Sequence, residues 1–94
     1  MVEQTVKVLN RAGLHARPAM ILVQLTLKYN SSILIEKEGK QVNAKSIMGV
    51  ITMAAHYGTE LKIIAEGDDE EEAVAAIVNL FNARFKEDDD DEEI

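Results

Sequence analysis

The seven residues Gly13-Leu14-His15-Ala16-Arg17-Pro18-Ala19 combine a histidine, an arginine and the only proline of the chain. We expect a helix to begin here, because proline fits the first helical turn, where its missing N–H donor is not needed. A helix N-terminus favours anions through its unpaired N–H groups and its dipole, and the donor fork of Arg17 suits phosphate or carboxylate. The imidazole of His15 is a nucleophile near neutral pH and can accept a phosphoryl group. The alternative is that His15 only caps the helix or packs its ring.

A second helix start is predicted at Ser46, because serine is a favoured N-cap residue. The apolar residues that follow it have helical i, i+3, i+4, i+7 spacing, which predicts an inward stripe of Ile47, Val50, Ile51 and Ala54. Met48 lies off that stripe. It either fills a gap in the core or forms an exposed, adaptable contact, and the spacing leaves both interpretations open.

The helix expected from Ala16 to about Lys28 is apolar nearly all round. Ala19, Leu22, Val23 and Thr26 can face a core, whereas Met20 and Leu27 fall on the side of Arg17. One interpretation is a deeply buried helix, but 94 residues offer little material to surround one. We therefore expect a partner surface beside His15.

Two-residue alternation predicts strands at residues 2–8 and 61–66. A short apolar run followed by polar residues predicts another at 33–37, and residues 40–44 complete a hairpin with it, with Glu38-Gly39 as the turn. A last helix is predicted after Gly67-Asp68-Asp69, which should cap it. Its inward stripe is Val74, Ile77, Val78, Phe81 and Phe85. The order strand, helix, hairpin, short helix, strand, helix indicates an α+β fold, with an antiparallel sheet covered by helices on one face.

Composition restricts the function further. The chain has no cysteine, which excludes disulfides and thiolate chemistry, and no apolar run approaches the ~20 residues that span a bilayer, so we expect a cytoplasmic protein without membrane insertion. Its net charge of −7 equals the charge of residues 87–93, and without them ten basic residues face ten acidic ones. We expect one domain over residues 1–86 and a disordered acidic tail at 87–94. No basic stripe suggests nucleic acid, and His56 is expected in a surface loop.

Gly13–Ala19 and the segment Asn43–Val50 together resemble the HPr family, the histidine-containing phosphocarriers of the bacterial phosphoenolpyruvate-dependent sugar phosphotransferase system. The resemblance covers residues 2 to 86 and leaves out only the acidic tail. It implies an open-faced β-sandwich, with four antiparallel strands and three helices. It also implies a monomeric phosphoryl carrier, without metal or cofactor, that is not an enzyme in the strict sense.

The resemblance assigns a role to each motif residue. His15 matches the histidine that takes a phosphoryl group from enzyme I on Nδ1 and passes it to EIIA components of sugar permeases, and Arg17 matches the arginine that pairs with the phosphate. Ser46 matches the serine that HPr kinase/phosphorylase phosphorylates with ATP. Met48, with Ile47 and Ile51, matches the apolar patch on which partners dock. This agrees with the partner surface expected from the first helix, so the docking residues would be Met20, Leu27, Ile47, Met48 and Ile51.

Two other functions fit the same residues. The chain could act mainly through Ser46 as a regulator of carbon catabolism, with a catabolite-control transcription factor or the kinase as partner, although the intact His15 argues against that as its sole role. It could also serve the nitrogen-related branch of the phosphotransferase system, but Ser46 and its neighbours favour the carbon branch.

Overall fold

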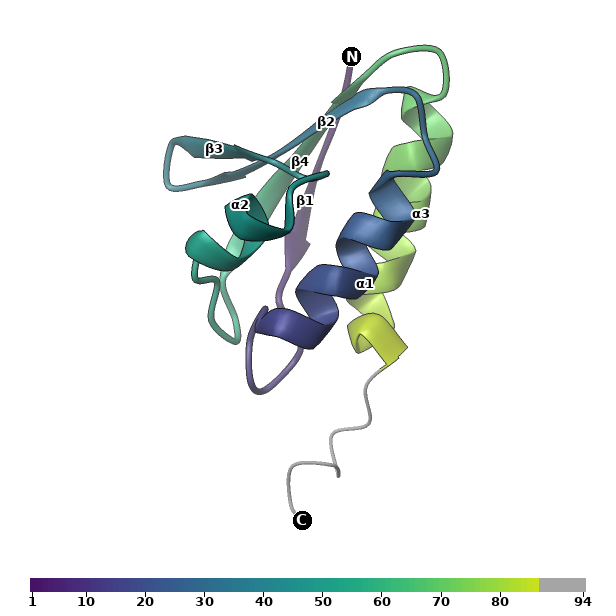
Figure 1. Ribbon diagram of the computed structural model, residues 1–94. Helices are drawn as coiled ribbons and strands as arrows, with labels where there is room; N and C mark the ends of the chain where they lie inside the picture. The colour runs from purple at the N-terminus through teal and green to yellow at the C-terminus, as the bar shows by residue number, and fades with distance from the viewer. Residues whose placement is uncertain (87–94) are drawn as a thin grey trace.

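The computed structural model describes residues 1–86, and the predicted disordered tail at 87–94 lies outside the described residues. The elements follow the predicted order (Figure 1). They are β1 (Val2–Lys7), α1 (Ala16–Thr26), β2 (Ser32–Lys37), β3 (Lys40–Asn43), α2 (Ile47–Thr52), β4 (Glu60–Glu66), α3 (Glu70–Asn82) and a short turn of 3-10 type, η1 (Arg84–Lys86). Within residues 1–86, no helix has the length and apolar character needed to cross a membrane.

The four strands form one antiparallel sheet in the order β1-β4-β2-β3, as predicted. Its register places Val6 opposite Leu61 and Ile35 opposite Ile63. These four side chains are buried on one face of the sheet, which the helices cover (Figure 1). The residues between them, such as Thr5 and Lys62, pair on the opposite face, as expected from the alternation along a strand.

The long helices α1 and α3 lie side by side against the sheet and close the core (Figure 1). In α3 the predicted stripe is confirmed at Val74, Ile77 and Phe81, which are buried, while Val78 packs at the edge of the core. Phe85 is also buried, but it lies beyond the end of the helix, in η1. The rings of Phe81 and Phe85 meet edge to face, with centroids 4.8 Å apart. Such a pair adds about 0.5–1.5 kcal/mol to what burial of its area contributes.

The inward stripe predicted for the short helix is partly wrong. Val50 is buried and Ile51 is half-buried, but Ile47 and Ala54 are exposed, and Met53 takes the inner position. The helix ends at Thr52, and Ala54 has a left-handed backbone with φ of 55°. Helical spacing therefore does not extend to Ala54, since that residue has already left the helix.

The predicted cap of α3 is also built differently. Asp69 occupies the N-cap position, but its side chain forms no capping bond within α3. Its carboxylate instead accepts hydrogen bonds from the backbone N–H groups of Asn30 and Ser31 and from the Ser31 hydroxyl. Asp69 thus joins the loop before β2 to the start of α3.

The turn η1 was not predicted and has an unusual backbone. Arg84, Phe85 and Lys86 all have φ between 54° and 61°, a left-handed conformation that disfavours residues with a Cβ atom. Two contacts offset this penalty: Phe85 is buried on Phe81, and the Arg84 carbonyl accepts a hydrogen bond of 3.0 Å from the Asn10 side chain. This last bond fixes the end of the described chain beside the loop that leads to α1.

Candidate functional site

His15 is the N-cap residue of α1, and its side chain is exposed and makes no capping hydrogen bond. The first bond of the helix runs from the Ala19 N–H to the His15 carbonyl, at 3.0 Å. Because Pro18 has no N–H, the Ala16 and Arg17 amides are the donors of this turn that the helix itself cannot use. Arg17 lies in the first turn of α1 and is exposed, and this turn contains no acidic residue. The arrangement favours an anion beside the imidazole.

The loop before His15 is held against the turn that follows α2. The Leu14 N–H donates to the Ala55 carbonyl at 3.0 Å, and the Leu14 side chain is buried. Gly13 has φ of +79°, and a Cβ atom there would lie 2.6 Å from the Ala55 carbonyl oxygen and 3.3 Å from the His56 Cα. Glycine is therefore required at Gly13 both for its φ and for the close approach of the two backbones.

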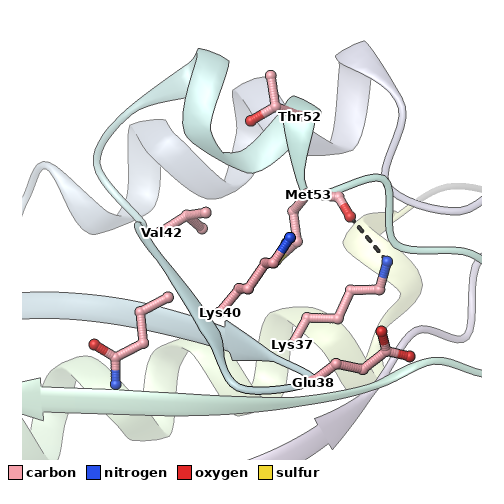
Figure 2. Close-up of a pocket in the computed structure, with 7 residues that line it drawn as sticks. Lys37, Glu38, Lys40, Val42, Thr52 and Met53 are labelled. Atoms are coloured by element: carbon pink, nitrogen blue, oxygen red, sulfur yellow. Dashed lines mark hydrogen bonds between the residues drawn. The ribbon is translucent and has the colours of Figure 1, made fainter.

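Lys37 supports the far side of that turn. Its ammonium group donates to the Met53 carbonyl at 3.0 Å (Figure 2). It also donates to the Ala54 carbonyl, at 3.4 Å. Lys37 also lines a cleft of about 380 Å³ between the β2–β3 hairpin and the end of α2. Neither His15 nor Ser46 lines this cleft, and the His15 side chain is exposed.

Ser46 is the N-cap residue of α2, as predicted. Its hydroxyl oxygen accepts a hydrogen bond of 3.1 Å from the Gly49 N–H, and the side chain is half-exposed. The Ser46 hydroxyl oxygen is thus the cap of this short helix.

Two hydrogen bonds fix the Ser46 segment to the last residue of α1 and to the loop that follows it. The buried Thr26 hydroxyl donates to the Ala44 carbonyl at 2.9 Å, and the Lys45 ammonium donates to the Tyr29 carbonyl at 2.7 Å. His15 lies at the other end of α1, whose eleven residues rise by about 16 Å. His15 therefore lies at the start of α1, and the segment that contains Ser46 is attached at its end.

Most of the predicted docking residues are exposed. The exposed fractions are 47% for Met20, 62% for Leu27, 38% for Ile47 and 66% for Met48, whereas Ile51 is half-buried and packs against the core. Met20 lies in α1 and Leu27 at its C-terminal end, whereas Ile47, Met48 and Ile51 lie in α2, and the two helices pack against each other. His56 is exposed in its loop, as predicted, and the neighbouring Tyr57 is also exposed.

Sequence reasoning missed the residues that hold the His15 loop in place. Asn10, Lys37 and Ala55 act through hydrogen bonds to or from backbone carbonyls, and such pairings leave no periodic signal. The glycine preceding Leu14 was the one available clue, since glycine in a loop often marks a positive φ.

The family model described as the PTS HPr component phosphorylation site matches residues 2–83. The phosphocarrier protein HPr of Treponema pallidum is 52% identical over 87 residues, which cover 93% of this chain and 99% of that protein. The HPr-like protein Crh of Bacillus subtilis is 50% identical, covering 79% of this chain and 87% of its own. The phosphocarrier protein NPr of Escherichia coli is 39% identical, with coverage of 93% and 98%.

Solved structures agree with the observed fold. A crystal structure of HPr from Thermoanaerobacter tengcongensis has a TM-score of 0.90 at 49% identity, covering 94% of this chain and 99% of that one. A structure of an HPr dimer from the same organism, also 49% identical and covering 93% and 100%, has a TM-score of 0.75. The family model spans nearly all of the described residues, and the relatives match over 87–99% of their own length, so the chain belongs to the HPr phosphocarrier family.

Proposed function

We propose that this chain is a phosphoryl carrier of the sugar phosphotransferase system, which takes a phosphoryl group from enzyme I on His15 and passes it to EIIA domains. The observation that supports this function best is the exposed His15 imidazole at the start of a helix whose first turn has no acidic residue. A carrier needs such an open position, because two different partners must reach the same nitrogen atom.

The chemistry requires a neutral imidazole with a free electron pair on Nδ1. As the N–P bond to Nδ1 forms, the bond from phosphorus to the donor group of enzyme I breaks, and the same exchange runs again with an EIIA acceptor. The phosphoryl oxygens would face the Ala16 and Arg17 amides and the Arg17 guanidinium. Because the exposed Arg17 is solvated, it stabilises the phosphoryl group moderately and still allows it to leave.

Ser46 is proposed as a regulatory site for HPr kinase/phosphorylase. Phosphorylation adds about −1.5 to −2 charges at neutral pH, beside the exposed side chains of Ile47 and Met48. Phosphate oxygens can replace the hydroxyl as acceptors for the Gly49 N–H, so α2 should keep its conformation. The effect is then a change of charge on the docking surface, which weakens binding of enzyme I and can create binding of a catabolite-control transcription factor.

The docking surface is proposed to comprise Met20, Leu27, Ile47 and Met48, with Ile51 at its half-buried edge. Long methionine and leucine side chains adapt to several partners, which suits a carrier that meets enzyme I, EIIA domains and a kinase in turn. We propose that the protein does this in the cytoplasm as a monomer. A monomer mass by light scattering at micromolar concentration tests this assembly, and a stable dimer contradicts it.

The test of the carrier function is incubation with enzyme I and phosphoenolpyruvate, followed by phosphorus NMR. Wild type should show a phosphohistidine on Nδ1, and His15→Ala should show none, since His56 lies in a different loop. His56→Ala is the matched control and should be labelled like wild type. Labelling of His15→Ala would contradict the assignment.

Two further measurements separate the alternatives. A regulator acting mainly through Ser46 would be phosphorylated by ATP and the kinase, as detected by mass spectrometry, yet would transfer no phosphoryl group from His15 to an EIIA domain. A carrier of the nitrogen branch would be labelled faster by the enzyme I of that branch than by the sugar-branch enzyme I. Ser46→Ala should abolish labelling by the kinase, and a wild type without phosphoserine would remove the regulatory role.

A further inference from the structure

The cleft between the β2–β3 hairpin and the end of α2 takes no part in the proposed carrier function, yet two lysine side chains line it (Figure 2). Its volume of about 380 Å³ lies near the lower end of the range for small-molecule sites, about 300–1,000 Å³. The residues that line it are Lys37, Glu38, Lys40, Gln41, Val42, Thr52 and Met53. The size of the cleft and its two lysines point to a small, charged ligand.

Lys37 and Lys40 form the residue pair that closes the hairpin turn, and the register of β2 and β3 places them directly opposite each other. Their side chains therefore lie on the same face of the sheet, which is also the face of the buried Ile35. Residues in such a pair have Cβ atoms about 4.5–5.5 Å apart, and like charges there destabilise a sheet. An anion between the two ammonium groups would offset this repulsion.

The two ammonium groups differ in their contacts. Lys37 donates to the Met53 and Ala54 carbonyls, which use two of its three N–H donors. Among residues 1–86, the Lys40 ammonium has no hydrogen-bond or ion-pair partner, and Figure 2 shows its side chain extending toward Met53 beside Lys37. Glu38 also lines the cleft, but no ion pair within these residues joins its carboxylate to either lysine. One donor of Lys37 and all donors of Lys40 are therefore available to a ligand.

A phosphate monoester matches this arrangement in charge. It carries about −1.5 to −2 charges at neutral pH and has three strong acceptor oxygens. Lysine binds phosphate as a point charge, and two ammonium groups attract a dianion more strongly than a monoanion. The half-buried Val42 and the buried Met53 add apolar surface to the lining, which favours a phosphate that carries an organic group over free phosphate.

We propose that this cleft binds a small phosphate monoester, with its phosphoryl oxygens between the Lys37 and Lys40 ammonium groups. Its organic group then packs against Val42 and Met53. The site is separate from His15, which does not line the cleft. Binding involves no phosphoryl transfer, so the inference holds or fails apart from the proposed carrier function.

Phenyl phosphate is the probe, added to the ¹⁵N-enriched full chain at about pH 7.5 and about 20 mM salt, where charges are weakly screened. Amide chemical shifts in residues 37–42 and 52–54 should change and saturate, with a dissociation constant on the order of 1 mM. Inorganic phosphate should bind about three- to tenfold more weakly, and phenol should leave these shifts unchanged. Absent or unsaturated changes, equal binding of inorganic phosphate, or changes confined to residues 15–19 would overturn the proposal.

Lys40→Gln removes one positive charge from the cleft and should weaken binding of phenyl phosphate about three- to tenfold. Lys28→Gln is the matched control, because it removes the same charge from an exposed lysine that does not line the cleft, and it should bind like wild type. Equal weakening by both substitutions would show attraction to the overall charge only and would overturn the proposal.

Thermal unfolding without any ligand gives a second test of the lysine pair. Lys40→Glu places opposite charges across the hairpin turn, so this variant should melt about 1–5 °C above wild type and should bind no phenyl phosphate. A melting temperature equal to or below that of wild type would contradict the repulsion between Lys37 and Lys40 on which the proposal rests.

Discussion

The starts of α1 and α3 use the same helix-end electrostatics in opposite ways. At α3 the chain supplies its own anions, since Asp69 precedes the helix and three glutamates occupy its first turn. Asp69 binds the loop before β2, and Glu70 accepts from the Gly67 N–H at 3.0 Å and pairs with the Met1 amino group at 3.1 Å. At α1 the first turn has no acid, and His15 caps nothing with its side chain.

The two helix starts differ in whether their polar groups already have partners within the chain. At the α3 start, hydrogen bonds from the Ser31 hydroxyl and then from the Asn30 N–H lower the pKa of Asp69 below its ordinary value. The Gly67 N–H and the Met1 amino group lower the pKa of Glu70 in the same way. At the α1 start, backbone N–H groups and Arg17 remain available for an anion that comes from outside. The acidic residues at the α3 start thus join segments of the fold, whereas the α1 start keeps its donors for the anion that the proposed function requires.

The largest expected effects come from alanine at the two crowded glycines. A Cβ atom at Gly67, where φ is +152°, would lie 2.6 Å from the Ser31 Oγ, and one at Gly13 would lie 2.6 Å from the Ala55 carbonyl oxygen. Each substitution should lower the free energy of unfolding by about 2–4 kcal/mol, measured by urea denaturation. Gly13→Ala should also slow phosphoryl acceptance by the folded fraction, because it displaces the His15 loop, whereas Gly67→Ala should not.

Gly39→Ala is the control for this pair. Gly39 also has a positive φ, of +84°, but a Cβ atom there meets nothing within 4 Å. The free energy of unfolding of Gly39→Ala should fall only by the backbone penalty of about 1–2 kcal/mol. Equal slowing of phosphoryl acceptance by Gly13→Ala and Gly67→Ala would remove the distinction between the two ends.

A second prediction concerns the stability of the protein at low pH. Because the pKa values of Asp69 and Glu70 are lowered in the folded state, their stabilisation is complete above about pH 4.5 and is lost as the pH falls through the folded-state values. The double variant Asp69→Asn/Glu70→Gln should therefore melt at a lower temperature than wild type at pH 7, and the difference should narrow below about pH 4. Thermal unfolding at pH 7, 4 and 2.5 measures it, with the exposed Glu71→Gln as control. A difference that widens on acidification would contradict this account.

How far the sequence predicted the structure depended on the kind of interaction. The buried alternation of Leu61, Ile63 and Ala65 and the stripe of α3 were predicted correctly, because burial repeats with the period of the element. The placement of His15 and Ser46 at helix starts also follows from local residue preferences. The Asp69 carboxylate bonds, the Lys37 contact with the end of α2 and the left-handed η1 could not be predicted, since each joins segments distant in sequence or depends on one backbone angle.

A third prediction tests the start of α2, which lies between the two extremes because Ser46 is both a cap and a proposed modification site. Ser46→Ala removes the acceptor for the Gly49 N–H and should lower the free energy of unfolding by about 1 kcal/mol. Ser46→Asp should lose much less, since aspartate is an equally good N-cap. Chemical denaturation of both variants measures this. If both variants were as stable as wild type, the Ser46 hydroxyl would have no structural role. Ser46 would then resemble His15, whose side chain caps nothing, more than Asp69, whose carboxylate joins two segments of the chain.

The smallest effect is expected at Ala54, in the turn that supports the His15 loop. Its φ of 55° places a residue with a Cβ atom in the left-handed region, where glycine is preferred after a helix, and its side chain is exposed, so no packing is lost on truncation. Removing this strain outweighs the larger conformational entropy of glycine in the unfolded chain, so Ala54→Gly should raise the free energy of unfolding by about 0.5–1 kcal/mol. The melting temperature should then rise by about 3–6 °C in calorimetry. Next to the start of α3, the residue with a positive φ is already a glycine, Gly67. A higher melting temperature of Ala54→Gly would show that backbone strain is stored in the turn beside the His15 loop. A lower melting temperature would show that it is not.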